Sequence, residues 1–275
     1  MARRSALMAR SGCRDLMGGK FEFLIYETAG PVASITLNRP ERLNAFNAGL
    51  RSELLAAVTK ASTDAAIRIV VLKGSGASFC AGADLSEGLG GSVTEQIETE
   101  YKPFLTGIEN SPKLWIAAVQ GSAAGIGGAL ALVCDFLVME EDAQIYMAFA
   151  AIGLIPDGGA GWQLQNALGP RRALEAIVEG QKLKGQRCLE LGLANKVVAN
   201  GKAGETAHAW AITLANGAPL AQAAAKRALR EMRGKSLGEA ISVEAKLQQA
   251  LTESEDFRNG VAAFFAKRKP EFSGR

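Results

Sequence analysis

Short runs of β-branched and apolar residues alternate along this chain with longer segments whose apolar residues recur at helical intervals. The runs VASITLN and RIVVLKG flank a segment in which Leu50, Leu54 and Val58 follow one another every four residues, a spacing typical of a helix that covers a sheet. The alternation continues through LWIAAV and FLVME, and later segments are mostly helical in pattern, apart from the run ANKVVA. This order predicts an α/β core over residues 21–200 and a helical region over residues 201–275.

The charge of the chain is unevenly distributed, which bears on its partners. Residues 1–20 hold five Lys or Arg residues against a single Asp, so that the other 255 residues carry a net charge of −1. A nearly neutral body argues against a nucleic-acid partner. The basic leader lacks the apolar run of a secretory signal, and Met8 and Met17 offer later starts. We expect residues 1–20 to be unstructured or the product of a mis-assigned start.

Cysteine and histidine usage argues against metal and disulfide chemistry. The four cysteines lie far apart and form no CxxC pair, so neither a zinc site nor a disulfide framework is indicated, and a reducing cytoplasm fits best. The single histidine, His208, has only Glu205 nearby in sequence, which indicates a helix-surface contact rather than a metal ligand. One histidine also leaves little support for a Ser-His-Asp triad. We therefore predict no metal site.

One uncharged stretch is long enough to raise the question of a membrane span. Residues 114–134 contain no charged side chain over 21 residues, a length that could cross a bilayer. Gln120, Ser122 and four glycines interrupt it, and this pattern predicts a strand, a turn and a helix instead. We expect no membrane partner.

Two glycine-rich turns follow predicted strands, at residues 74–85 and 120–132. Small residues allow a ligand to approach the main chain, and a helix start offers backbone N–H groups without internal partners. Together the two turns could form a two-donor oxyanion hole. Close packing of a helix on a strand is the alternative for either turn alone. A dinucleotide-binding turn is a poor fit, because Leu130 occupies its third small position.

Asp157 is the only charged residue between Asp142 and Arg171. The sequence Pro-Asp-Gly is a strong turn signal, and this aspartate could also cap a helix that begins near Gly159. A catalytic carboxylate is the other interpretation. Both remain open on the local pattern.

Five motifs, in order, resemble the enoyl-CoA hydratase/isomerase, or crotonase, superfamily: LNRPERLNAFN, SFCAGADL, QGSAAGIGGALALVCD, IGLIPDGG and GVAAFFAKRKPEF. The resemblance extends over roughly residues 21–275. It implies an α/β fold in which a crotonase-type β-β-α spiral core forms two roughly perpendicular sheets, followed by a C-terminal α-helical oligomerisation region. The implied assembly is a homo-trimer, or a hexamer made of two trimers.

The resemblance also implies a site for an acyl-CoA thioester. Its carbonyl oxygen would accept hydrogen bonds from the backbone N–H groups of Ala83 and Ile126, which form the oxyanion hole. The remaining matched positions contact the CoA moiety, with the last two supplied by a neighbouring subunit: Arg42, Leu43, Ala81, Asp84, Leu85, Phe264 and Lys267. The resemblance implies no cofactor beyond the CoA of the substrate.

The chain departs from the family pattern at two acidic positions. Typical hydratases of the family use two glutamates, and the matching positions here are Ala129 and Phe149. Ordinary hydration is therefore in doubt, because neither side chain can hold or deprotonate water. Asp157 matches a position at which some isomerases of the superfamily carry a catalytic aspartate. Its surroundings most resemble ring-epoxide isomerases of phenylacetate degradation and Δ3-Δ2 enoyl-CoA isomerases.

These features predict an acyl-CoA isomerase in which Asp157 shuttles one proton. We expect apolar neighbours to desolvate the carboxylate and raise its pKa; the candidates are Phe149, Ile152, Leu154 and Ile155. A hydratase with an atypical acid and a non-catalytic acyl-CoA-binding protein are the alternatives.

Overall fold

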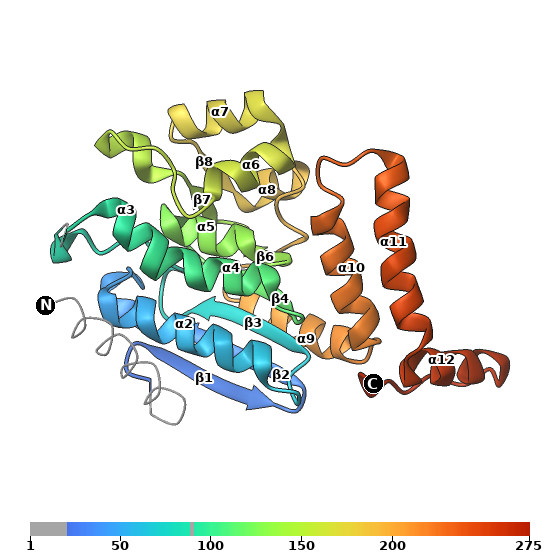
Figure 1. Cartoon of the computed structure of the whole chain (residues 1–275). Helices are drawn as coiled ribbons and strands as arrows, with labels where there is room; N and C mark the ends of the chain where they lie inside the picture. Colours follow the sequence, from blue (N-terminus) through green and yellow to red (C-terminus); the bar gives the residue numbers. More distant parts are fainter. Residues whose placement is uncertain (1–20, 89–90) are drawn as a thin grey trace, which may run out of the picture.

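The computed structural model describes residues 21–88 and 91–275, and within these ranges the strands form two sheets. The predicted leader, residues 1–20, lies outside the described residues. The large sheet has the strand order β1-β2-β3-β4-β6-β9, and the small sheet has the order β5-β7-β8. This two-sheet core, followed by helices, agrees with the fold that the resemblance implies (Figure 1).

The large sheet is parallel except at its edge strand β1, which pairs antiparallel with β2. Its strands are β1 Leu24–Ala29, β2 Val32–Leu37, β3 Ile69–Gly74, β4 Leu114–Val119, β6 Phe136–Glu140 and β9 Lys196–Val198. All six residues of β4 are buried, as is expected of a central parallel strand covered on both faces. The predicted strand runs correspond to β2, β3, β4, β6 and β9.

Helices cover the two faces of the large sheet. On one face, α2 (Ala48–Thr63) buries apolar side chains against alternate strand residues such as Val70 and Leu72. On the other, α9 (Ala203–Ala215) packs an alanine every fourth residue against Ile69 and Val71. Alternating residues of one strand thus face two different helices, because strand side chains point to opposite faces in turn. The packing of the large sheet therefore extends beyond residue 200.

The small sheet positions the site. It comprises β5 Ser122–Ala124, β7 Gln144–Tyr146 and β8 Lys182–Lys184. These strands and the edge strand β1 were not predicted; the three-residue strands are too short to show a two-residue period. The uncharged stretch at residues 114–134 contains the predicted strand, β4, and the predicted helix, α5 (Ile126–Val133), while the predicted turn between them includes the short strand β5. No helix in the described residues is long and apolar enough to cross a membrane.

The remaining helices lie around this core and beyond it. They are η1 Pro40–Arg42, η2 Leu85–Glu87, α3 Val93–Gln96, the π-helical η3 Ile97–Tyr101, α4 Lys102–Asn110, α5 Ile126–Val133, η4 Ala148–Ile152, α6 Ala160–Leu168, α7 Pro170–Val178, α8 Gly185–Glu190, α10 Pro219–Glu231, α11 Leu237–Thr252 and α12 Glu255–Phe265. In Figure 1, α11 and α12 lie at the opposite end of the molecule from α3.

Candidate active site

The two glycine-rich turns lie side by side. Cys80 and Ala123 form a parallel β-bridge, in which the Cys80 N–H donates to Ser122 O at 3.0 Å and the Ala124 N–H donates to Cys80 O at 2.8 Å. Ala83 lies three residues after Cys80, and Ile126 lies three residues after Ala123. The bridge thus holds both predicted oxyanion donors in register, at the ends of two adjoining turns.

Glycine is required on both sides of this junction. Gly82 has a φ of +103° and Gly125 a φ of +53°, a region that side chains with a Cβ rarely adopt. A Cβ atom on Gly82 would lie 3.0 Å from Ala124 O, and one on Gly125 would lie 3.9 Å from Gly82 Cα. The two turns can approach this closely because neither position carries a side chain.

The Ala83 and Ile126 N–H groups are available to a ligand. Among the described residues, neither group has a hydrogen-bond acceptor. Ile126 is the first residue of α5, whose N-cap residue Gly125 has no side chain to cap the first turn. Two adjoining backbone donors, one of them at a helix N-terminus, can stabilise a developing oxyanion.

Asp157 lies in the turn between η4 and α6, and its side chain does not serve as a helix cap. The Ala160 N–H donates to the Asp157 backbone O at 3.0 Å, but α6 begins after Gly159 with no side-chain cap bond within the described chain. The Asp157 Oδ1 atom is buried and has no hydrogen-bond partner in the part of the chain that the structure describes. Burial raises the pKa of Asp157 to about 6. The predicted turn at Asp157 is therefore present, but the Asp157 side chain does not cap α6.

The source of this desolvation differs from the prediction. Ile152, Leu154 and Ile155 are 56%, 58% and 82% exposed, so these three side chains point away from the interior. The next residue, Gly158, has a φ of +58°, and it contacts a different set of apolar side chains.

A Cβ atom on Gly158 would collide with Ile126 Cδ1 and would lie 3.1 Å from both Ala129 Cβ and Leu105 Cδ1. The backbone next to Asp157 therefore packs directly on α5, which carries the oxyanion donor Ile126, and on α4. The turn that carries Asp157 therefore packs on residues far apart in sequence, whereas its own apolar neighbours along the chain point outward.

The two positions that the resemblance matches to the glutamates of typical hydratases are apolar and buried. Ala129 is fully buried in α5, on the surface that meets Gly158. Phe149 is buried in η4, and its Cζ atom would lie 3.7 Å from a Cβ atom on Gly125. Ala129 thus lies beside the Gly158 turn, and Phe149 lies beside Gly125.

The predicted CoA-contacting residues of the first two motifs lie together. The Ala81 N–H donates to Leu43 O at 2.9 Å, and the Asp84 N–H donates to Phe46 O at 3.0 Å. Leu43 and Leu85 expose much of their apolar side chains, and Arg42 at the end of η1 is exposed.

Asp84 already has partners within the chain. Its carboxylate accepts hydrogen bonds from Arg39 at 3.0 Å and from the Ser86 hydroxyl at 2.6 Å. These bonds hold the pKa of Asp84 below its usual value, and the bond from Ser86 has the largest effect. Its side chain orders the turn that follows Ala83.

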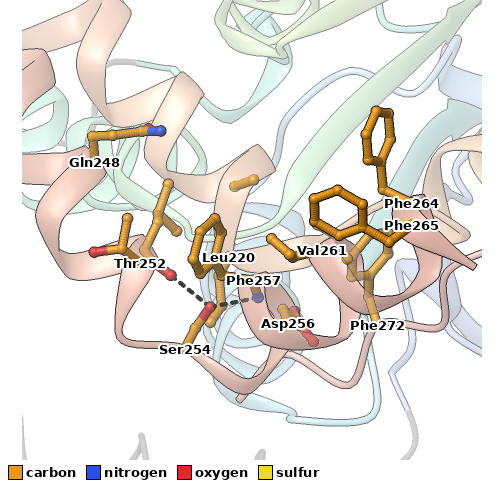
Figure 2. Close-up of a pocket in the computed structure, with 14 residues that line it drawn as sticks. Leu220, Gln248, Thr252, Ser254, Asp256, Phe257, Val261, Phe264, Phe265 and Phe272 are labelled. Atoms are coloured by element: carbon orange, nitrogen blue, oxygen red, sulfur yellow. Dashed lines mark hydrogen bonds between the residues drawn. The ribbon is translucent and has the colours of Figure 1, made fainter.

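Phe264 and Lys267 do not join the other predicted residues within one chain. Phe264 is 78% exposed, and Lys267 follows the end of α12 with a φ of +51°. In Figure 1, α12 lies far from α3 and the adjoining α4 beside the site. Phe264 instead lines an apolar pocket of about 540 Å³ between α10, α11 and α12, together with Phe257, Phe265 and Phe272 (Figure 2).

Sequence reasoning missed Tyr101, at the end of η3. Its side chain is buried, and its hydroxyl has no hydrogen-bond partner in residues 21–88 and 91–275. Phe104 and Ile108 recur at helical spacing after it, a pattern that indicates a core face and gives no sign of an unpaired hydroxyl. A separate cavity of about 230 Å³ lies between Ile97, Leu105 and the Gly158 turn. The described residues hold no cluster of three or more side chains suited to a metal ion.

Comparisons with known proteins agree with this geometry. A family model described as enoyl-CoA hydratase/isomerase matches residues 27–275. A probable enoyl-CoA hydratase from Rhodobacter capsulatus is 39% identical over 252 residues, which cover 91% of this chain and 97% of that protein. A 1,2-epoxyphenylacetyl-CoA isomerase from Escherichia coli is 34% identical over 260 residues, covering 92% and 99%. The crystal structure of an enoyl-CoA hydratase from a Polaromonas species superposes with a TM-score of 0.86 at 34% identity, covering 90% of this chain and 99% of that one.

Proposed function

The chain belongs to the enoyl-CoA hydratase/isomerase family, and on that premise we propose that it is an acyl-CoA isomerase. The observation that carries the proposal is the Oδ1 atom of Asp157, which is buried without a partner among the described residues, in a turn whose next residue, Gly158, packs on Ala129. Moving a double bond needs one base, whereas the two-glutamate hydration of the family needs two acids. The similarity to a 1,2-epoxyphenylacetyl-CoA isomerase supports the same choice.

The proposed mechanism begins with the thioester carbonyl between the Ala83 and Ile126 N–H groups. The Asp157 carboxylate removes a proton from the carbon next to the carbonyl of a 3-enoyl thioester. The electron pair of that C–H bond is delocalised onto the carbonyl oxygen as an enolate, which the two N–H groups stabilise. Loss of one such donor typically costs about 2.7–4 kcal/mol of transition-state stabilisation.

The protonated Asp157 then returns its proton to the far carbon of the original double bond. The enolate electrons re-form the carbonyl, and the double bond comes to lie next to it. A base with a pKa of about 6 suits this cycle, because it is ionised at neutral pH and still basic enough to accept a carbon-bound proton. The reaction neither consumes nor releases a proton. The proposal includes no cofactor beyond the CoA of the substrate.

We further propose that the enzyme acts as a homo-trimer or a hexamer. In such an assembly Phe264 and Lys267 of one subunit would contact the CoA bound by another. The exposed apolar surface of α12 supports this proposal, and so does the distance of α12 from the site within one chain (Figure 1).

A panel of saturated, 2-enoyl, 3-enoyl, aryl and ring-epoxide CoA esters, assayed with wild type and Asp157→Asn, tests the function. We expect wild type to isomerise a 3-enoyl or ring-epoxide thioester. Asp157→Asn should lower kcat by about 10²–10⁴-fold, the usual contribution of acid–base catalysis, with little loss of CoA-ester binding. Asp142→Asn is the matched control, because Asp142 is exposed and bonded only to Asn200 among the described residues.

Two other outcomes identify the rival functions. The similarity to a probable enoyl-CoA hydratase favours hydration as the second candidate. Hydration of crotonyl-CoA at roughly 10 s⁻¹ or more, a rate typical of enzymes, would support it. Binding of CoA esters without turnover of any ester in the panel would indicate a non-catalytic binding protein. Full isomerase activity in Asp157→Asn would remove this residue from the mechanism.

A further inference from the structure

Tyr101 lies between the two halves of the site. Its ring meets the Phe46 ring edge-on at 5.8 Å between centroids, and the Phe46 backbone is bridged to the oxyanion residue Ala83. One helical turn later, Leu105 packs on Gly158, next to Asp157. The tyrosine thus packs on the neighbour of one predicted oxyanion donor, and the helix that follows it packs on the turn that carries Asp157.

The ring of Tyr101 is held firmly in place. Phe104 packs against its edge at 6.0 Å, and the Arg51 guanidinium lies over its face at 5.4 Å from the centroid. Glu100 accepts a hydrogen bond from Arg51 Nε, so the cation is fixed as well. The residue also ends a π-helical segment, an irregularity that often marks functional positions. The position of the hydroxyl is therefore set by the packing of the ring.

The Tyr101 hydroxyl is a hydrogen-bond donor at neutral pH. Burial raises the pKa of Tyr101 to about 12, Arg51 opposes that rise, and the negative charge of Asp157 adds to it. Both the Tyr101 hydroxyl and Asp157 Oδ1 are buried without a partner in the described chain. A buried hydroxyl without a partner is unfavourable and uncommon in native structures. A ligand oxygen in the site would satisfy it.

Tyr26 shows that an unpaired hydroxyl does not by itself indicate a site. Its hydroxyl is also buried and unpartnered among the described residues. However, its ring lies under Lys60 at 4.5 Å from the centroid, and Asp64 influences its pKa. Both of those residues lie at the C-terminal end of α2, whereas Asn47, next to the site residue Phe46, caps its N-terminal end. Tyr101 differs because its ring packs on Phe46, which is bridged to Ala83, and because the charge of Asp157 raises its pKa.

We propose that the Tyr101 hydroxyl donates a hydrogen bond to an oxygen atom of the acyl group, close to the carbons that exchange the proton. The preferred substrates are then acyl-CoA thioesters with an epoxide, ether or hydroxyl oxygen near those carbons, in preference to plain hydrocarbon chains. This inference rests on the proposed isomerase function and specifies its substrate class.

The test compares wild type, Tyr101→Phe and the control Tyr26→Phe. The first measurement is binding, by calorimetry, of 2-hydroxyphenylacetyl-CoA and of phenylacetyl-CoA, which differ by one hydroxyl. We expect wild type to prefer the oxygenated ester by about tenfold or more, since a site built to pair a polar group discriminates against a ligand that lacks one. Tyr101→Phe should abolish that preference, while Tyr26→Phe should keep it within about twofold of wild type.

The second measurement is kcat/KM for the ring-epoxide thioester and for a straight-chain 3-enoyl thioester. Tyr101→Phe should lower the ratio of kcat/KM for the epoxide to kcat/KM for the 3-enoyl ester by about tenfold, because mainly the value for the epoxide should fall. An equal loss on both esters, or an unchanged binding preference, would overturn the proposal, because either result indicates a packing role only. If wild type isomerises neither ester, the proposed function fails, and the calorimetric preference still decides whether Tyr101 contacts the acyl oxygen.

Discussion

The α/β core and the last two helices differ in where their apolar side chains lie. In the core, Phe46, Phe104 and Trp115 are fully buried within a single chain. In α11 none of the residues is buried by the rest of the described chain, and in α12 Phe264 and Phe265 are 78% and 79% exposed. The core therefore gains its stability from contacts within the chain, whereas the apolar face of α12 gains little unless another surface covers it.

The same contrast applies to function. Asp157, Ala83 and Ile126 are brought together by packing inside the core, and a single chain is sufficient to form that arrangement. Phe264 and Lys267 lie at the other end of the molecule (Figure 1). Under the proposed function they act only across a subunit boundary. Variants in the two regions should therefore differ in their effects, from large losses of stability in the core to small ones at α12.

The largest expected effect is on core packing. Phe104→Ala removes a buried ring stacked on Phe46 at 5.6 Å and should lower the free energy of unfolding by about 3–5 kcal/mol. Phe265→Ala, the matched substitution on α12, should change the unfolding of the isolated chain by less than about 0.5 kcal/mol. Urea unfolding at low protein concentration measures both. Similar losses for the two variants would contradict the distinction between core and tail.

The turn that carries Asp157 is the next point to test. Gly158→Ala forces a Cβ atom into Ile126 and also places alanine at a φ of +58°, whereas Gly153→Ala, at +73°, meets no described atom within 4 Å. The left-handed conformation alone costs about 1–2 kcal/mol, and overpacking adds about 1–3 kcal/mol at Gly158 only. Thermal unfolding should show that difference, and Gly158→Ala alone should lose isomerase activity. Equal effects would mean that the close contact does not matter.

The pH dependence of catalysis reports the desolvation of the base. Because the carboxylate form of Asp157 accepts the proton, kcat/KM should be constant above a pH of about 6 and fall about tenfold per unit below it, equivalent to about 1.4 kcal/mol per unit. Asp157 has its ordinary pKa of 3.8 in the unfolded chain and a higher one in the folded chain. The folded state therefore binds this proton more tightly, and the contribution of Asp157 to stability should decrease as the pH rises from about 4 to about 6. A profile that breaks near pH 4 would mean that the carboxylate is solvated in the working enzyme.

The smallest effect on the fold of one chain is expected at the α12 surface. The double variant Phe264→Ser and Phe265→Ser should leave the far-ultraviolet circular dichroism unchanged, because both side chains point outward. Its sedimentation mass should fall from three or six chains to one, and CoA-ester affinity should fall with it. If wild type sediments as a single chain at micromolar concentration, the proposed role of α12 as an interface is wrong.

Much of the architecture could be predicted from local pattern. The strands β3, β4 and β6 are mostly buried apolar runs, and α2 shows its buried face as a repeat of leucine and valine. The small sheet could not be predicted, since its strands have three residues each and depend on pairing with distant segments. Cys80 and Ala123, for example, are bridged although 43 positions separate them.

The sequence by itself determined the family, the two glycine turns and the apolar identity of Ala129 and Phe149, which the resemblance matches to acidic positions, because these are matters of residue identity and order. Only the tertiary structure decided what surrounds Asp157. The adjacent Ile152, Leu154 and Ile155 point outward, whereas the turn that carries Asp157 packs on α4 and α5 through Gly158. Burial depends on which distant segments meet, and neither hydrophobicity nor spacing along the chain specifies that contact.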